Sequence, residues 1–153
     1  MLFKQAALGD ERAFMTVKNV EASSITLGYA VALCVATTAS FDGTNAVMSA
    51  TGSAASLPGF LGIATATIPS NQYGLVQIFG NCASVLLSNQ ATSITIAAGN
   101  PLIPTALPGG LSSGAPTYAA SGFNWVIASG PYLSNTISFA APLYCSGFIR
   151  CIK

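Results

Sequence analysis

The chain has 153 residues, of which 5 are Lys or Arg, 4 are Asp or Glu and none is His, so 6% are charged and the formal net charge is +1. Five basic side chains cannot build the surface that a nucleic-acid binder needs, and a chain without His has no Ser-His-Asp triad and no imidazole metal site. Three of the four acids lie within the first 21 residues, which argues against a paired-carboxylate hydrolase, so we expect a structural or binding protein, not an enzyme, with no metal, cofactor or nucleic-acid partner.

The first 22 residues differ in composition from the rest of the chain. They contain six of its nine charges, and they also contain large apolar side chains. A charged, partly apolar segment ahead of a neutral domain has the form of a docking arm, although a frayed end followed by a first strand would have the same composition. We expect residues 1–22 to form such an arm, which binds its partner through Phe3, Lys4, Asp10, Arg12, Phe14 and Lys18.

The clearest element lies between Ile25 and Val35. Large apolar residues alternate there with small ones over 11 positions, which is typical of a β-strand, with a bend at Gly28. The small face favours close approach of another layer of the fold.

Eight more strands are expected at short intervals along the chain. Turn sequences such as Asp42-Gly43, Gly80-Asn81 and Gly130-Pro131 separate them, and no useful window has the 3.6-residue period of a helix. This pattern predicts an all-β protein, a small antiparallel barrel or sandwich formed as a single domain by residues 23–153. The expected strands are Ala46–Thr51, Phe60–Thr67, Gly74–Phe79, Cys82–Leu87, Ser93–Ala97, Trp125–Ala128, Thr136–Phe139 and Leu143–Ile152.

A proline-rich stretch interrupts this series. Pro101, Pro104, Pro108 and Pro116 lie within 16 residues, and Pro has no backbone N–H to donate to a sheet. We expect this stretch to be a loop or an irregular edge, and not a central strand. It serves either as an ordered contact loop or as a long surface connection.

Two pairs of short segments repeat one another. Gly28–Val31 resembles Gly99–Leu102, 71 positions later, and Gly62–Thr65 resembles Val126–Ser129, 64 positions later. Short apolar motifs also recur by chance. If these repeats are structural, they predict two similar sub-barrel halves.

No charged residue occurs among the 107 positions from Gly43 to Ile149. Either Ser, Thr, Asn and Gln coat a neutral, soluble surface, or much of the surface faces other protein. The second interpretation is favoured, because a charge-poor surface near zero net charge has little protection against association. No stretch offers the ~20 apolar residues of a membrane span, and the start lacks the apolar core of a signal peptide, so we expect no membrane contact and synthesis in a cytoplasm.

Cysteines and aromatic residues supply the remaining candidates for chemistry. The four cysteines allow three pairings and show no Cys-x-x-Cys spacing, so in a reducing cytoplasm we expect buried free thiols. They are Cys34, Cys82, Cys145 and Cys151. Three aromatic residues, Tyr118, Phe123 and Trp125, form either a sugar-stacking platform or apolar anchors of a core or an interface.

Five motifs follow one another in an order that resembles a known family. They are Thr26–Val31, Phe60–Ala64, Gly74–Gly80, Ala98–Leu102 and Gly109–Leu111. The succession resembles the capsid decoration (cement) proteins of tailed bacteriophages. In that family a Gly-x-x-Val strand, a Gly-Ile/Val-Ala strand, a Val-x-Val-x-Gly strand and a Gly-Asp-Pro-Leu turn build a small β-barrel. The resemblance covers roughly residues 26–133, and Tyr29 and Asn100 stand where the family often has Asp.

This resemblance implies a structural protein of the virion without catalytic residues. Such a protein is made in the host cytoplasm and sits on the outside of a phage head as a dimer or trimer, where it bridges subunits of the major capsid protein. Another virion component, such as a tail or head-fibre protein, is the alternative. A sugar-binding β-domain is a further one.

Overall fold

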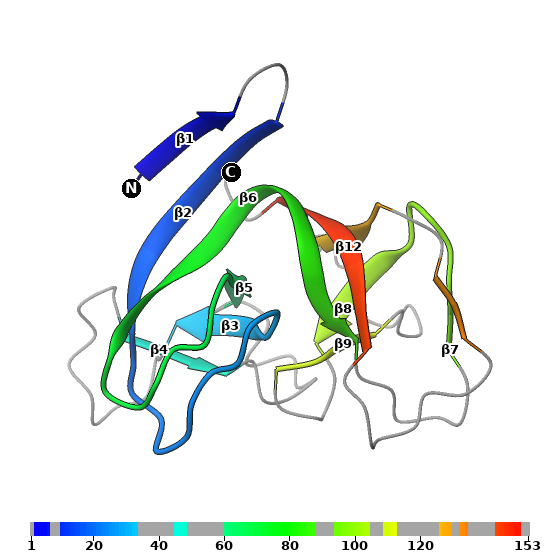
Figure 1. The fold of residues 1–153 in the computed structure, drawn as a ribbon. Coiled ribbons are helices and arrows are strands. Elements are labelled where there is room, and N and C mark those ends of the chain that lie inside the picture. The colour runs from blue at the N-terminus through cyan, green and yellow to red at the C-terminus, as the bar shows by residue number, and fades with distance from the viewer. Residues whose placement is uncertain are drawn as a thin grey trace.

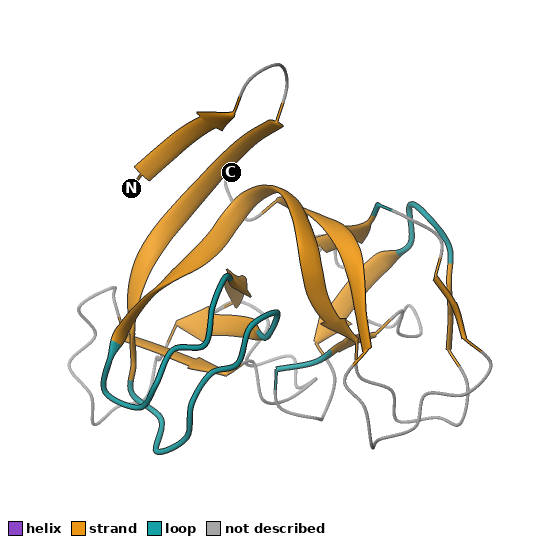
Figure 2. Cartoon of the chain, in the orientation of Figure 1, coloured by secondary structure: helices purple, strands orange, loops and turns teal. Residues whose placement is uncertain are grey.

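Residues 2–6, 10–33, 45–48, 60–87, 94–104, 109–112, 126–129, 132–134 and 143–150 are described in the computed structural model (Figure 1). They form strands and turns and contain no helix (Figure 2), so none of them belongs to a helix that could cross a membrane. The expected all-β fold class is confirmed. The strands are β1 (Leu2–Ala6), β2 (Asp10–Asn19), β3 (Ala30–Leu33), β4 (Asn45–Met48), β5 (Phe60–Ala64), β6 (Tyr73–Leu87), β7 (Ile94–Ile96), β8 (Pro101–Pro104), β9 (Leu111–Ser112), β10 (Val126–Ala128), β11 (Tyr132–Ser134) and β12 (Leu143–Arg150).

Ten of these strands pair into one curled sheet that closes on itself twice (Figure 1). In one ring β2, β4, β3, β5 and β6 pair in that order, and β6 pairs back with β2. In the other ring β6, β12, β10, β8 and β9 pair in that order, and β9 pairs back with β6. We call these rings the first barrel and the second barrel. The long strand β6 is a wall of both.

The two barrels are built from the same strand pairings. Ala30 pairs with Ile63 in the first barrel, and Pro101 pairs with Ile127 in the second, at the offsets of 71 and 64 positions that the sequence repeats predict. Three further pairs of paired residues correspond, two within the rings and one beside them. The pairing of Ile63 with Gln77 corresponds to that of Ile127 with Phe148, and the pairing of Lys18 with Tyr73 corresponds to that of Leu86 with Tyr144. The pairing of Ile25 with Ile68 corresponds to that of Ile96 with Tyr132.

Each barrel also contains the same turn. Gly28 is the third residue of the hydrogen-bonded turn 26–29 and has a φ of +81°, and Gly99 is the third residue of the turn 97–100 with a φ of +87°. These are type II turns, which favour Gly at this position. The N–H of Gly28 donates to the carbonyl of Ala64 at 2.9 Å, and that of Gly99 donates to Ala128 at 2.8 Å. The two sub-barrel halves expected from the sequence are therefore confirmed.

The strand β6 passes from one barrel to the other without a break. The sequence predicts two strands separated by a turn at Gly80-Asn81, and this is wrong, because β6 continues for 15 residues. Gly80 lets β6 bend against the neighbouring strand, since a Cβ there would collide with the carbonyl oxygen of Glu11. The buried amide of Gln77 braces the bend by donating to the carbonyls of Phe79 at 3.1 Å and Asn81 at 2.9 Å.

The strand expected at Ile25–Val35 is shorter in the structure. Ile25 forms an isolated bridge with Ile68, the type II turn at Gly28 follows, and β3 begins only at Ala30. The alternating pattern is therefore divided among a bridge, a turn and a strand, because the turn reverses the chain in its middle.

The proline-rich stretch contains a strand with a neighbour on each side. β8 pairs with β10 and with β9, so the expected loop or irregular edge is wrong for Pro101 to Pro104. Pro101 is the first residue of its strand, where a missing N–H disturbs the ladder least. Pro108, Pro116 and the strand expected at Thr136–Phe139 lie outside the described residues.

The charged leader forms a hairpin that is joined to the first barrel. β1 pairs with the start of β2, so that Leu2 lies opposite Phe14 and Ala6 lies opposite Asp10. β2 pairs with β6 along residues 13–18. Ala13 and Val17 are fully buried. β2 is thus a wall of the barrel, and the sheet begins well before the boundary drawn at residue 22. β1 and the adjoining end of β2 project beyond the first barrel (Figure 1).

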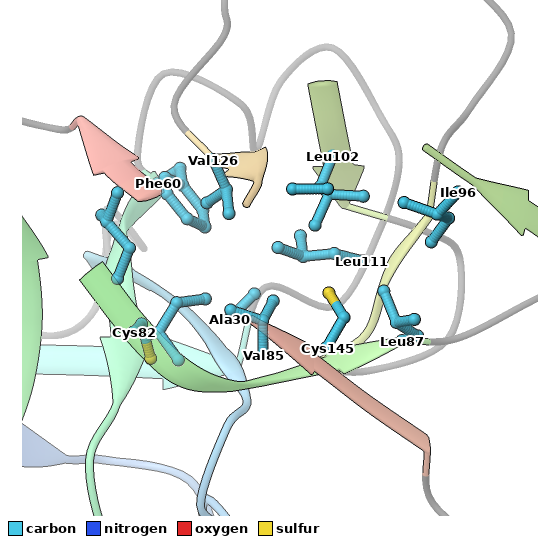
Figure 3. Close-up of a cluster of buried hydrophobic side chains, with 13 residues drawn as sticks. Ala30, Phe60, Cys82, Val85, Leu87, Ile96, Leu102, Leu111, Val126 and Cys145 are labelled. Carbon is cyan, nitrogen blue, oxygen red and sulfur yellow. The ribbon is translucent and has the colours of Figure 1, made fainter. Parts of the chain in front are cut away.

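Each barrel encloses its own group of buried side chains. Equivalent positions supply them, namely Val17, Val31 and Ile78 in the first barrel and Val85, Leu102 and Ile149 in the second. Ala30 of β3 and Phe60 of β5, both from the first barrel, join the group of the second (Figure 3). Ile63 of β5 belongs to the same group. Because this group spans both barrels, we expect them to unfold together.

Candidate interaction site

The projecting hairpin of β1 and β2 carries most of the residues expected to contact a partner. Arg12 and Phe14 alternate along β2 and are half-buried, beside the fully buried Ala13. The register places Lys4 opposite Arg12 and Phe3 opposite Ala13. The structure therefore brings these residues together, with Asp10 at the beginning of the same strand.

Lys18 lies at the other end of β2, on the same side of the strand as Arg12 and Phe14. It pairs with Tyr73 of β6, and Thr16 pairs with Leu75. Tyr73 is 65% exposed and Leu75 is 43% exposed. We call these four residues, Thr16, Lys18, Tyr73 and Leu75, the outer face of the first barrel. Large apolar side chains held in solvent beside one another mark a surface that suits contact with another protein.

Sequence reasoning missed Tyr73 and Leu75. It predicted a strand at residues 74–79 but did not assign the two sides of that strand to core and solvent. The signal was the alternation itself, since Val76 is fully buried and Ile78 nearly so, which leaves residues 73 and 75 on the opposite side. Only the pairing of β6 with β2 adds Thr16 and Lys18 to the same surface.

The equivalent face of the second barrel is covered by the first barrel. Its covered residues are Ser84, Leu86 and Tyr144, which correspond to Thr16, Lys18 and Tyr73. Ser146, 71 positions after Leu75, is exposed. The N–H of Leu86 donates to the carbonyl of Gly28 at 2.9 Å. A Cβ added at Gly28 would lie 2.8 Å from Cε1 of Tyr144 and 3.0 Å from the carbonyl oxygen of Ser84.

A second contact joins the barrels beside this one. The N–H of Ala30 donates to the carbonyl of Gly109 at 2.8 Å, and the ring of Tyr29 occupies the place where a Cβ of Gly109 would stand. The turn at residues 26–29 is therefore the part of the first barrel that docks on the second.

The buried thiols are protonated near neutral pH. Cys82 and Cys145 are free and buried, as the sequence predicts. Burial raises the pKa of Cys145 to about 11, with a smaller contribution from Cys82. Burial also raises the pKa of Cys82. Since the thiolate is the reactive form, these two residues act as small apolar side chains.

Asn19 is a buried polar residue with a structural role. Its amide nitrogen donates to the carbonyls of Ser23 at 2.8 Å and Ile68 at 2.9 Å, and its amide oxygen accepts from the N–H of Glu21 at 2.9 Å. These bonds hold together the turns on either side of the Ile25–Ile68 bridge. Both N–H groups and the oxygen of the amide therefore have partners within the chain.

The other candidates from the sequence lie outside the described residues. They are Asp42-Gly43, Cys34, Cys151, Tyr118, Phe123 and Trp125. Among the residues that the structure does describe, no three or more His, Cys, Asp or Glu side chains come together in a way that could hold a metal ion.

Comparison with models of known protein families finds none that matches this chain, and comparison with curated proteins finds no relative. The projecting hairpin and the outer face of the first barrel are therefore the basis for assigning a function.

Proposed function

We propose that this protein is a capsid decoration (cement) protein, a structural protein that binds the outside of a phage head. The observation that carries the proposal is the run of 107 uncharged positions from 43 to 149, which supplies strands to both barrels and also supplies the exposed Tyr73 and Leu75. A surface so poor in charge suits a protein that functions in contact with other protein. The five motifs that resemble the cement family support the same function.

The projecting hairpin is the part that contacts the major capsid protein. Its contact residues are Phe3, Lys4, Asp10, Arg12 and Phe14, while Lys18 lies beyond the hairpin on the outer face. Because the protein binds the assembled lattice and not dissociated subunits, its binding free energy stabilises the lattice. Many copies on one shell make modest contacts collectively strong.

Sedimentation with expanded empty heads of the virus that encodes the chain tests this proposal. The full chain is expected to sediment with the heads, and a Phe3→Ser/Lys4→Ser double variant is expected to remain largely in the supernatant. Both substitutions lie in β1, which is not part of either ring, so the barrels should keep their fold. Ala66→Ser, at an exposed position of the first barrel, is the matched control and should bind normally.

Two results would contradict the proposal. If the wild-type chain stays in the supernatant, the protein does not decorate the head. If the double variant sediments as fully as the wild-type chain, the head contact is not made by the hairpin.

A further inference from the structure

We infer that a second copy of this chain docks its turn 97–100 on the outer face of the first barrel, repeating between copies the contact that the turn 26–29 makes on the second barrel within one chain. This head-to-tail contact does not depend on the proposed function, because it needs no shell.

The contact within the chain joins two unlike surfaces. The turn 26–29 of the first barrel meets Ser84, Leu86 and Tyr144 of the second barrel, with Gly28 at the point of closest approach. The reverse contact is absent between the described residues of the two barrels, because Gly99 has no atom within 4 Å of an added Cβ. The two barrels are therefore not related as a symmetric pair, in which the turn of each would pack on the face of the other. It leaves one docking turn and one docking face open.

The open face has the chemistry of the covered one. Tyr73 stands where the second barrel has Tyr144, and Thr16 stands where it has Ser84. Two positions differ. Leu75 stands where the second barrel has Ser146, which is exposed, and Lys18 stands where it has Leu86. A lysine stem can lie along an apolar partner while its ammonium group stays in water. The 65% exposure of Tyr73 shows that this face is uncovered within the chain.

The open turn is already held in the docking conformation. Asn100 N–H donates to the carbonyl of Ala97 at 3.0 Å, and Ala97 N–H donates to Oδ1 of Asn100 at 2.8 Å. Gly99 has the same left-handed conformation as Gly28, and Ala97 to Gly99 are exposed. A turn that needs no reordering loses little conformational entropy when it binds.

The strands that follow the two turns differ in burial, as the turns themselves do. Ala30 and Ile63 of the first barrel are fully buried, since they reach the core of the second barrel. Their equivalents in the second barrel, Pro101 and Ile127, are only half-buried. A second copy placed on the repeat would cover them, as the second barrel covers Ala30 and Ile63.

These four observations favour a second copy over any other occupant of the outer face. Each copy offers one turn and one face, so the contact can repeat from chain to chain and close into a ring. A second copy supplies a turn with the conformation of the turn that already packs on the equivalent face within the chain, and an unrelated protein need not contain such a turn.

Light scattering with size-exclusion chromatography on the full chain, over a dilution series, tests the inference. The wild-type chain is expected to associate reversibly. Tyr73→Ser removes the ring from the face, and Gly99→Asn places a side chain on the turn at a residue type that tolerates positive φ. Each variant alone is expected to be monomeric. Tyr73→Phe, which keeps the ring, should associate as the wild-type chain does.

Mixing the two variants provides the decisive measurement. A Tyr73→Ser chain retains an intact turn, and a Gly99→Asn chain retains an intact face, so an equal mixture is expected to form a 1:1 dimer. Circular dichroism and urea unfolding establish that each variant is folded, and Ala98→Arg is a second turn variant if Gly99→Asn does not fold. A monomeric wild-type chain, variants that associate normally, or a mixture that stays monomeric would each overturn the inference. No heads are present in this assay, so its outcome is separate from that of the sedimentation test.

Discussion

The two barrels have the same pairings but use them in different surroundings. In the first barrel the turn at Gly28 is packed against a neighbour, while in the second barrel the turn at Gly99 is open. Tyr144 is half-buried beneath Gly28, while its counterpart Tyr73 is 65% exposed. Each half of the repeat therefore carries a turn and a face of the same kind, and position within the chain decides which of them are covered.

The barrels also differ in how the segments outside their rings are held. In the second barrel β7 and β11 form a two-stranded sheet with three paired positions. In the first barrel only Ile25 and Ile68 pair at the equivalent place, and the amide of Asn19 supplies the missing links. The second barrel has Leu87 at the position of Asn19, inside its apolar core. A buried amide thus replaces backbone pairing in one half.

The largest expected effect is the loss of stability on truncating Ile63, compared with that on truncating its equivalent Ile127. Ile63→Ala should lower the free energy of unfolding by about 4 kcal/mol, since it removes a fully buried side chain from the core that joins the barrels. Ile127→Ala should cost about half as much, because Ile127 is only half-buried. Urea unfolding of the two variants gives both values. Equal costs would mean that the barrels are packed alike, against the comparison.

Substituting the two turn glycines isolates the contact between barrels. Gly28→Ala should cost about 3 kcal/mol, since the methyl group must displace Tyr144 and the backbone at Ser84 in addition to adopting positive φ. Gly99→Ala should cost only about 1 kcal/mol, the strain of the left-handed conformation. Thermal and urea unfolding measure the difference, which should vanish if the turn at Gly28 does not bear on the second barrel.

Placing Leu at position 19, as the second barrel has at the equivalent position 87, tests whether the buried amide stabilises the first barrel. Asn19→Leu should lower the free energy of unfolding by about 2 kcal/mol, because the carbonyl of Ser23 and the N–H of Glu21 lose the bonds that Asn19 makes, and the carbonyl of Ile68 keeps only its bond from the N–H of Ile25. Amide hydrogen exchange should report the largest loss of protection at residues 21–25 and 68–72. A variant as stable as the wild-type chain would show that these bonds contribute little.

Alkaline pH should weaken the second barrel through its thiols. Folding raises the pKa of Cys145 from 9.0 to about 11, so the thiol's contribution to stability is complete below pH 9 and is lost as the pH rises toward 11. The first barrel has Gly74 at the equivalent position. The urea midpoint measured at pH 8 and pH 10.5 should fall less for Cys145→Ser than for the wild-type chain, and an identical fall would contradict this cause.

Salt should have the smallest effect. The self-contact joins a turn without charged side chains to a face with one lysine, so screening has few ion pairs to weaken. The association constant from light scattering should change less than about threefold between low and high salt, which corresponds to roughly 0.6 kcal/mol. A steep loss with salt would indicate a different, charged interface.

Parts of the site could be predicted from local sequence and parts could not. Arg12, Phe14 and Lys18 were singled out by the contrast between the charged leader and the neutral remainder, and all three lie on β2. Tyr73 and Leu75 were missed because their exposure depends on which side of β6 meets the core. Lys18 lies beyond the hairpin because β1 pairs with β2 only along residues 10–14, while the pairing of β2 with β6 extends to residue 18.

The sequence by itself determined the all-β fold and the internal repeat, since turn glycines and alternating apolar residues act over a few neighbouring positions. Gly28 and Gly99 could be recognised 71 positions apart because a type II turn needs the same residue wherever it occurs. Only the tertiary structure decided that β6 continues through Gly80, that β2 is a barrel wall, and that one docking turn is filled while the other is open. Those outcomes depend on contacts between residues far apart in the chain, such as that of Leu86 with Gly28. A pattern of neighbouring residues cannot indicate which distant residues will meet or how strongly they will interact.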